Sequence, residues 1–331
     1  MEQKIELSKN VFAQNFAIAK SAFALNTSLE ASACAAAFIG NNVPTTEEAM
    51  KTAKKILSKN TSFLSSVRTG NCRQVVTATL AQSRDPEYAL TQIKKIHKGL
   101  DKKFFDSDYL VLAATMIYRS CRESEYDMYI KRTREIYKLI RKDHPFITGR
   151  EDITSCVVMA LTNVDTEVIA RNAEVCFEAL DKHFFGREKI QNMACISACF
   201  AGDADDQAEV IRKTYDMFKS EGVRFDTQAF GIIAATGLLV REEDRKTVIK
   251  RIRKLSDEMK SIRGMGPMGA GKRIRHIMAC AIVLDAYTGG DSMARSGVIN
   301  AIISEIIAIE IAAMCAAMSA ASASAAASAS H

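Results

Sequence analysis

The 331-residue sequence contains no tryptophan and only four prolines. The lack of tryptophan removes an aromatic side chain well suited to stacking on a sugar, which weighs against a carbohydrate-active site. Because proline interrupts helices, its scarcity leaves room for long, continuous helices. No long segment rich in Val, Thr and Tyr alternates with the period of two that a half-buried strand requires. The sequence therefore predicts an all-α protein.

Motifs for metal binding and redox chemistry are also missing. The nine cysteines include no CxxC pair, and the five histidines form neither HxxxH nor HExxH. Cys195 and Cys199 share one face of an expected helix, but without a third ligand nearby we expect them to pack in the core. We therefore expect no metal and no cofactor.

The cysteines and the first residues also indicate a compartment. The odd number of cysteines, most of them in apolar helical patterns, fits a reducing environment better than a disulfide framework. The amino-terminal segment lacks the basic start, apolar stretch and cleavage site of a secretory signal. We therefore expect a cytoplasmic protein.

A repeat of about forty residues runs through the sequence. In each unit a charged helix ends, the chain passes an aromatic residue in a short turn, and an apolar helix rich in small residues begins. The turn residues, spaced by 39 to 42 positions, are Phe63, Phe105, Phe146, Phe185 and Phe225, followed by the segment 265–268. This period is typical of stacked helical hairpins. We expect a right-handed-type stack of hairpins resembling an α-solenoid.

The hairpin pattern assigns each expected helix to one of two layers. The expected outer, charged helices are 46–59, 86–99, 124–142, 166–182, 204–220 and 241–262. The expected inner, apolar helices are 27–40, 71–83, 107–121, 150–162, 188–201, 227–239 and 271–287. Asp85 before Pro86 indicates a helix start. The pairs Thr45/Glu48 and Thr148/Glu151 have the spacing of capping boxes.

The carboxyl-terminal segment departs from the repeat. Residues 296–318 are apolar nearly all round, so the helix expected there must be buried. Glu305 and Glu310 weigh against a membrane span, because carboxylates are costly near the bilayer centre. We expect a repeat domain over 1–290, an apolar capping or association helix over 291–318, and an Ala/Ser tail over 319–331. This helix offers a means of homodimer formation or of contact with a membrane surface.

Basic residues recur in the turns that lead into the inner helices. The candidates for anion binding are Arg68, Arg150, Arg187, Arg224, Lys272 and Arg273. If the hairpins stack, these side chains lie along one edge together with helix amino termini, which attract anions. Acids share the same turns, namely Asp106, Asp108, Glu151, Asp152, Glu188 and Asp226, so a solvated edge is the simpler interpretation.

Residues 266–273 resemble a phosphate-binding loop without completing it. The segment GPMGAGKR satisfies GxxxxGK, but Arg273 stands where the motif needs the Ser or Thr that binds Mg²⁺. The motif should also follow a strand, whereas the preceding segment predicts a charged helix. We therefore expect an interhelical turn, in which the glycines and nearby cations are still able to bind an anion.

Positive charge is concentrated in residues 245–276, which hold eleven Lys/Arg against Asp257 and Glu258. Such a block attracts nucleic acid or an anionic surface. It contains no aromatic residue for base stacking, which weighs against binding of single strands. Nucleic acid is therefore a disfavoured partner.

Several short motifs resemble one known group of proteins. They are FLSSVRTG (63–70), FFDSDYLVLAA (104–114), TREIYKLIRKDHPFITGREDI (133–153) and GMGPMGAGKRIRHIMACAIVL (264–284). Together with the Ile- and Ala-rich carboxyl terminus, they resemble an uncharacterised family of all-helical bacterial proteins known mainly from Firmicutes. The resemblance implies an all-helical fold and carries no activity or site residues.

Two functions follow as hypotheses. The favoured one is a non-catalytic binding or scaffold protein whose hairpins form a groove for a peptide, a protein or a small anionic ligand. The alternative is a helical-barrel enzyme acting on a small or phosphorylated substrate, with carboxylates at the starts of the inner helices around a cavity. Two converging carboxylates, or Arg68, Arg150 and Arg187 in one cavity, would favour the enzyme.

Overall fold

The computed structural model describes residues 1–289 except 24–26, 63–64, 70–71, 102–105, 146–147 and 163. This part of the chain folds into fifteen α-helices and three short 3₁₀ helices, without a strand. The predicted all-α class is therefore confirmed. Within the described residues no helix is long and apolar enough to cross a membrane. The predicted helix over 296–318 lies outside the described residues.

The helices alternate between an outer and an inner layer. The outer helices are α1 (Glu2–Ala22), α3 (Glu47–Asn60), α6 (Pro86–Asp101), α8 (Tyr126–Asp143), α10 (Thr166–Asp181), α12 (Ala204–Ser220) and α14 (Glu242–Glu258). The inner helices are α2 (Ser28–Ala36), α5 (Arg73–Gln82), α7 (Asp108–Ser120), α9 (Ile153–Ala160), α11 (Arg187–Ser197), α13 (Phe230–Leu239) and α15 (Gly271–Thr288). The short elements are α4 (Ser66–Thr69), η1 (Glu123–Glu125), η2 (Thr227–Ala229) and η3 (Met259–Ser261).

The helix starts agree with the sequence at one position and differ at another. The Asp85 carboxylate accepts a hydrogen bond from the Tyr88 N–H at 2.9 Å, as predicted. The cap of α3 is Thr46 rather than Thr45. Thr45 instead donates its backbone N–H to the Asn15 side chain of α1 at 2.8 Å. A tertiary contact therefore moves this cap by one residue.

The capping box predicted at Thr148 and Glu151 is wrong. Helix α9 begins at Ile153 with Asp152 at the cap position. The Asp152 carboxylate accepts the Gly149 N–H at 2.8 Å, so it closes the preceding turn instead of capping the helix. An acid just before a helix can therefore accept a hydrogen bond from the preceding turn instead of from the first turn of the helix.

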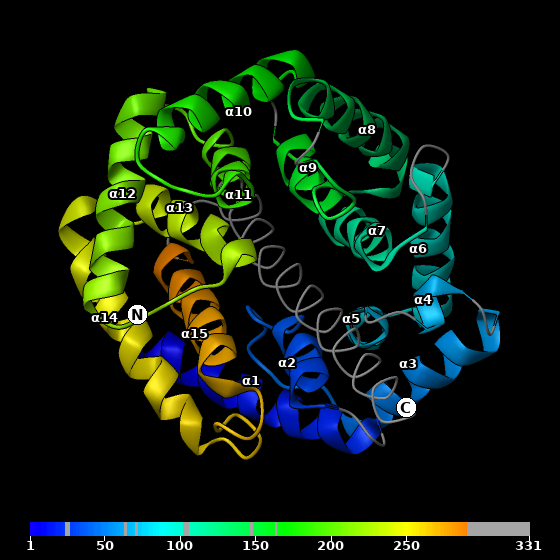
Figure 1. Ribbon diagram of the computed structural model, residues 1–331. Coiled ribbons are helices and arrows are strands. Elements are labelled where there is room, and N and C mark those ends of the chain that lie inside the picture. Colours follow the sequence, from blue (N-terminus) through cyan, green and yellow to red (C-terminus); the bar gives the residue numbers. More distant parts are fainter. Residues whose placement is uncertain are drawn as a thin grey trace, which may run out of the picture.

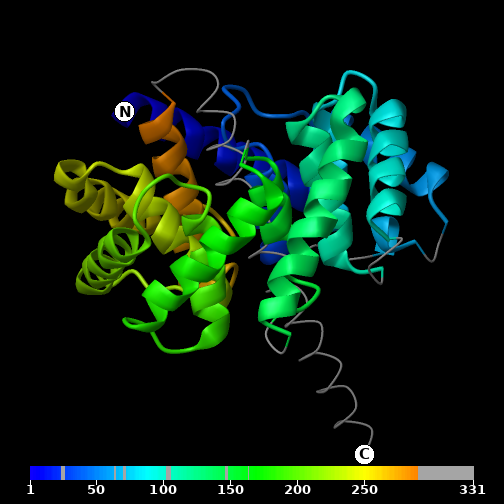
Figure 2. The same ribbon diagram turned by 90° about the horizontal axis from the view of Figure 1, so that it is seen from above.

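The hairpins close into a ring. Each inner helix packs against the next one, from α2 to α15, as the repeat predicts. The last inner helix, α15, then packs against both α1 and α2, so the seventh hairpin meets the first (Figure 1). Figure 2 shows α15 lying beside the amino-terminal helix from a second direction. The expected open stack is therefore not confirmed.

Charged side chains join the two ends of the ring. Arg251 of α14 pairs with Glu2 of α1 at 2.8 Å and with Glu258 at 3.3 Å. Lys9 of α1 reaches the same Glu258 at 3.4 Å. The Arg251 side chain is only 9% exposed, so its ion pairs are screened less than surface pairs are. We call this set of contacts the seam.

Small residues allow the helices of the two layers to approach closely. On α13, a methyl group added at Gly231 would lie 3.2 Å from the Ile196 side chain of α11. One added at Gly237 would lie 2.8 Å from the Thr214 hydroxyl of α12. The neighbouring residues Ile232–Thr236 are buried as well. Helix α13 is therefore held between an inner and an outer neighbour, and glycine is the residue that fits both contacts.

Candidate anion-binding site

The inner helices begin side by side along one edge of the ring. Gln74 in α5 donates to the Glu30 carboxylate in the first turn of α2 at 2.7 Å. Cys72, just before α5, contacts the carbonyl oxygen of Asp108 at the start of α7, with Sγ and O 3.3 Å apart. These three helices therefore run in the same direction.

The same contacts continue around the ring. Gln191 in α11 lies 3.5 Å from the Thr148 hydroxyl in the turn before α9. Arg273 of α15 pairs with Asp226, in the turn before α13, at 2.7 Å. Ser32 of α2 contacts the Met265 sulfur in the loop before α15 at 3.5 Å. We call the edge formed by the segments that lead into the inner helices the amino-terminal rim.

The six predicted anion-binding residues lie on this rim or beside it, but the structure does not bring all of them together. Arg68 donates to the Thr61 carbonyl at 3.3 Å. The guanidinium of Arg187 lies 5.1 Å from the centre of the Phe177 ring. Arg150 is exposed on the turn before α9. These three arginines line none of the cavities described below.

The other three candidates belong to the sector of the rim at α13 and α15. Arg224 lies in the turn before α13, and Lys272 and Arg273 are exposed in the first turn of α15. Arg224 borders a cavity of about 360 Å³ between α11, α12 and this turn, which we call the rim pocket. Its lining residues are Lys189, Tyr215, Phe218, Lys219, Val223, Arg224, Phe225, Asp226, Thr227, Phe230 and Ile233.

Aromatic rings form much of the rim pocket. Phe218 and Phe225 meet edge to face with their ring centres 5.1 Å apart. Tyr215 lies between Phe230, at 5.9 Å, and Phe184, at 5.6 Å. Phe218 is almost fully buried, so this wall is fixed by the core. The rings offer an apolar, aromatic wall of the kind that lines small-molecule sites.

Three cations surround these rings. The Lys189 ammonium lies 5.0 Å from the centre of the Phe230 ring, and Lys219 and Arg224 are exposed. The one carboxylate in the lining, Asp226, is engaged by Arg273 through both of its oxygens, at 2.7 and 2.8 Å. Its charge is therefore balanced by a residue outside the lining. The net charge facing the pocket is positive.

A buried histidine holds the turn that carries Arg224. The Nδ1 atom of His276, a residue of α15, lies 3.3 Å from the Arg224 backbone nitrogen. The same Nδ1 atom lies 3.2 Å from the Arg224 carbonyl oxygen, so the ring contacts both backbone groups of Arg224, and the tautomer decides whether it accepts from one or donates to the other. Burial lowers the pKa of His276 and favours the neutral ring. The ring also packs against Phe225 with the centres 6.5 Å apart. Helix α15 thus fixes both the cationic and the aromatic side of the rim pocket.

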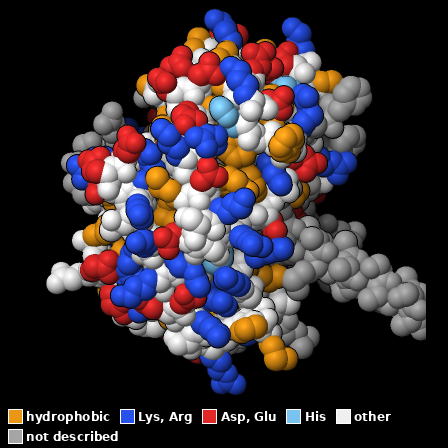
Figure 3. Space-filling model, turned by 60° about the vertical axis from the view of Figure 1, so that its left-hand side comes forward, with side chains coloured by type: hydrophobic (Ala, Val, Ile, Leu, Met, Phe, Trp, Pro, Cys, Tyr) orange, Lys and Arg blue, Asp and Glu red, His pale blue; other side chains and the backbone are white. Residues whose placement is uncertain are grey.

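The predicted basic block, residues 245–276, divides into buried and exposed cations. The buried arginines bind backbone carbonyls: Arg245 binds Val240 at 3.2 Å, and Arg275 binds Ser256 at 3.0 Å. Others remain exposed, among them Lys246, Lys250, Lys254 and Lys260. Figure 3 shows this side of the molecule, on which Lys and Arg side chains gather among fewer acids. Part of the positive charge of residues 245–276 is therefore buried in the fold, where it binds backbone carbonyl oxygens and does not face solvent.

The incomplete phosphate-loop motif is an interhelical turn, as expected. It connects η3 to α15 and follows the charged helix α14 rather than a strand. Gly271 has a φ of +83°, a conformation that suits glycine, and its N–H binds the Gly266 carbonyl at 3.1 Å.

Three acids of the rim, Asp152, Glu151 and Glu188, lie close enough to interact electrostatically. Asp152 is buried next to Gln191, and burial raises the pKa of Asp152 to about 7. Such a pKa suits acid/base chemistry. However, Asp152 lines none of the described cavities. Nor do the described residues hold a group of three His, Cys, Asp or Glu arranged to bind a metal.

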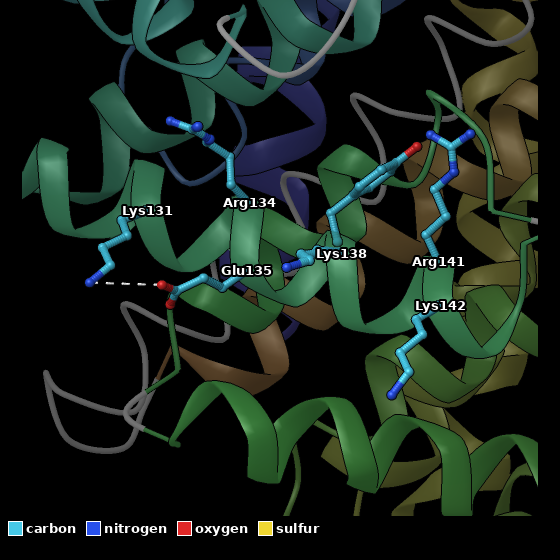
Figure 4. Close-up of a pocket in the computed structure, with 7 residues that line it drawn as sticks. Lys131, Arg134, Glu135, Lys138, Arg141 and Lys142 are labelled. Atoms are coloured by element: carbon cyan, nitrogen blue, oxygen red, sulfur yellow. Dashed lines mark ion pairs between the residues drawn. The ribbon is translucent and has the colours of Figure 1, made fainter.

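A second basic site was missed by the sequence reasoning. A hollow of about 610 Å³ lies over helix α8, and we call it the α8 hollow (Figure 4). Its described lining residues are Lys131, Arg134, Glu135, Tyr137, Lys138, Arg141 and Lys142. The signal was present in the sequence, because these cations recur at helical spacing along one stretch of the expected helix 124–142.

One comparison with known proteins identifies the group to which the chain belongs. A family model described as "Protein of unknown function (DUF4003)" matches residues 15–319. The chain belongs to the DUF4003 family. This family assignment confirms the resemblance seen in the sequence and names no activity. The region matched by the DUF4003 model includes the rim pocket and the α8 hollow. No curated protein and no solved structure matches the chain.

Proposed function

We propose that this DUF4003 protein is a non-catalytic binding protein whose rim pocket takes a small anionic ligand with a flat apolar body. The observation that carries this proposal is the combination of Lys189, Lys219 and Arg224 around an aromatic floor. A carboxylate or phosphate group attached to a ring or to another planar body matches both parts. The volume of about 360 Å³ falls within the range of small-molecule sites.

The physical basis is that each part of the pocket contributes to affinity. Charge-assisted hydrogen bonds contribute about 1.5–3 kcal/mol each, and arginine binds planar oxyanions through two N–H groups. The rings of Phe225 and Phe230 cover the apolar part of the ligand. Because His276 and the core hold the pocket walls in place, little conformational freedom is lost on binding.

The ring supplies the scaffold in this proposal. A stack of hairpins of the α-solenoid type, closed at the seam, fixes α11, α12 and α13 relative to one another. The eight cysteines of the described residues are free thiols, six of them buried, which supports a reducing, cytoplasmic setting.

Isothermal titration calorimetry with phenyl phosphate and with inorganic phosphate tests the proposal. We expect phenyl phosphate to bind more tightly, and the Lys189→Gln/Arg224→Gln variant to bind it about tenfold more weakly. Phe225→Leu should reduce the preference for phenyl phosphate over inorganic phosphate. Lys213→Gln is the matched control, because Lys213 is a half-exposed cation of α12 outside the pocket lining.

Two results would overturn the proposal. One is an affinity for phenyl phosphate that stays unchanged in the Lys189→Gln/Arg224→Gln variant. The other is the absence of binding at millimolar concentration by wild-type protein whose thermal unfolding is cooperative.

A further inference from the structure

Two apolar side chains stand almost completely in solvent on the amino-terminal rim. Phe185, in the turn before α11, is 95% exposed, and Met268, in the loop before α15, is fully exposed. Other exposed large apolar side chains of the described residues reach only 40–70%. Scattered exposed apolar residues are normal on protein surfaces, but these two stand on the same edge of the ring. We call them the apolar tips.

The backbone directs Phe185 away from the core. Its neighbour Phe184 is buried and meets the Tyr215 ring edge to face, with the ring centres 5.6 Å apart. The following residue, Gly186, has a φ of +97°, a conformation that suits glycine, and the chain turns there into α11. Phe185 is therefore fixed at the tip of its turn.

A hydrogen-bonded loop presents Met268. The Gly269 N–H donates to the Gly266 carbonyl oxygen at 3.0 Å. Pro267 and Met268 are the two residues between them, so they form the tip of a tight turn. Met265, at the base of the loop, is completely buried and anchors the turn to the core. The second tip is therefore held as firmly as the first.

The two tips flank α13. This helix packs against α11 on one side and α15 on the other. Arg273 of α15 pairs with Asp226, in the turn before α13, at 2.7 Å. The Lys189 ammonium of α11 lies 5.0 Å from the centre of the Phe230 ring of α13. Because the three helices begin on one edge of the ring, a flat surface can touch both tips at once.

The surroundings of the tips are positively charged. They are formed by residues 183–189, 219–229 and 260–273, which we call the tip sector. It contains eight Lys and Arg against three Asp and Glu. One of these acids, Asp226, is already paired with Arg273. The tip sector therefore combines apolar tips with an excess of cations.

These features distinguish a membrane from a protein as the partner. A stable protein interface buries about 1,200–2,000 Å² around an apolar centre, whereas the tips are single side chains among charges. A second copy of the chain would bring cations against cations, which repel. An anionic bilayer suits both features, because it takes up single apolar side chains and its headgroups attract Lys and Arg.

We propose that the tip sector docks onto an anionic lipid bilayer, with Phe185 and Met268 inserted at the level of the headgroups and upper acyl chains. The surrounding Lys and Arg side chains hold the rim against the negative surface, and their attraction weakens as the salt concentration rises. Docking goes beyond the proposed ligand binding and does not depend on it, because neither tip lines the rim pocket.

Co-sedimentation with lipid vesicles tests the proposal. We expect the protein to bind vesicles with about 30% phosphatidylserine at least about tenfold more tightly than vesicles of phosphatidylcholine alone. The tip variant, Phe185→Ser/Met268→Ser, should bind the phosphatidylserine vesicles at least about tenfold more weakly. Arg263→Gln/Lys272→Gln, which removes two exposed cations of the tip sector, should have a similar effect. Circular dichroism checks that each variant is folded.

The lack of tryptophan in the sequence offers a second readout. In Phe185→Trp the indole reports on its own surroundings, and its fluorescence should shift to shorter wavelength when phosphatidylserine vesicles are added, because the ring leaves water. Val43→Trp, at a 70% exposed position in the loop between α2 and α3, should show no such shift.

Matched controls separate the tip sector from the rest of the surface. Val43→Ser/Met128→Ser removes two exposed apolar side chains outside it, and Lys246→Gln/Lys250→Gln removes two exposed cations of α14. Both should bind phosphatidylserine vesicles within about twofold of the wild type. The tip variant should bind phenyl phosphate as the wild type does, so docking and ligand binding can fail separately.

Three results would overturn the proposal. One is failure of the wild type to bind phosphatidylserine vesicles. Another is equal binding of these vesicles by the wild type and the tip variant. The third is self-association of the wild type that the tip variant loses and that vesicles do not compete with, which would make a second copy of the chain the partner.

Discussion

Replacing Asp152 with asparagine removes a carboxyl group that the fold buries between α9 and α11. Asp152 is 7% exposed, and burial raises its pKa from 3.8 to about 7. The neighbouring Glu151 and Glu188 also raise this pKa, while the Gly149 N–H and Gln191 lower it. The folded protein therefore holds a proton on Asp152 over a pH range in which the unfolded chain has lost it.

The sign of the pH dependence follows from this proton. Between about pH 4 and 7 the folded state binds more protons than the unfolded state, so the free energy of unfolding falls as the pH rises. The two pKa values differ by about 3, which at about 1.36 kcal/mol per unit gives a loss of up to about 4 kcal/mol above pH 7. Asparagine carries no charge at any pH and avoids this loss.

Asparagine also suits the local hydrogen bonds. Its oxygen would keep the Gly149 N–H, which the Asp152 carboxylate accepts at 2.8 Å. The Gln191 side chain donates to the Asp152 carboxylate, so its amide must turn over to bring Oε1, which is buried without a hydrogen-bond partner in the described part of the chain, toward the new N–H donor. We expect Asp152→Asn to be more stable than the wild type at about pH 8, by up to about 4 kcal/mol. The difference should shrink as the pH falls toward 4.

Urea unfolding followed by circular dichroism at several pH values between about 4.5 and 8 measures this difference. Asp127→Asn is the control, because it makes the same chemical change at an exposed position in the first turn of α8. The reasoning is refuted if the free energy of unfolding of Asp152→Asn changes between about pH 5 and 8 by the same amount as that of the wild type.

Three further predictions concern the seam, the packing of α13 and the incomplete phosphate-loop motif. Arg251→Ala should lower the free energy of unfolding by about 1–3 kcal/mol, whereas Glu2→Gln, at an exposed partner, should cost less than about 1 kcal/mol in the same urea assay. Gly237→Ala should destabilise the protein by about 1–2 kcal/mol despite the better helix propensity of alanine, because its methyl group would press on Thr214; an increase in melting temperature would contradict this. Mg²⁺-dependent hydrolysis of ATP or GTP should be absent, and a turnover that Lys272→Ala abolishes would show that the motif is functional.

Most of the helices and their assignment to two layers were readable from the sequence, but the first outer helix, α1, was not among those expected. Outer helices such as 86–99 and 204–220 combine a charged face with an apolar one, and this pattern places them within two residues of α6 and α12. Helix propensity and side-chain periodicity act within a few turns, so local sequence is sufficient. The cap of α3 was one residue off because Thr45 binds Asn15, thirty residues away. Contacts of that kind leave no local pattern.

For the candidate sites, too, the sequence indicated the features that lie within one segment and did not indicate which segments come together. The sequence indicated that basic residues recur in the turns before the inner helices, and the contacts between neighbouring helix starts place those turns along one rim. It did not indicate that Arg224 would join Lys189 and Lys219, because these residues belong to three different elements. The α8 cations could have been found, since helical spacing alone puts Arg134, Lys138 and Arg141 on successive turns.

By itself, the sequence determined the all-helical class, the hairpin period and the order of the layers, because these depend on propensities and patterns that repeat within each unit. Only the tertiary structure decided that the hairpins close into a ring. Closure depends on small angles between successive units that add up over seven hairpins, and on contacts such as Arg251 with Glu2, 249 positions apart. The tertiary structure also decided which Lys and Arg side chains face solvent. A buried arginine such as Arg275 and an exposed Lys246 carry the same charge in the sequence and differ in their surroundings alone.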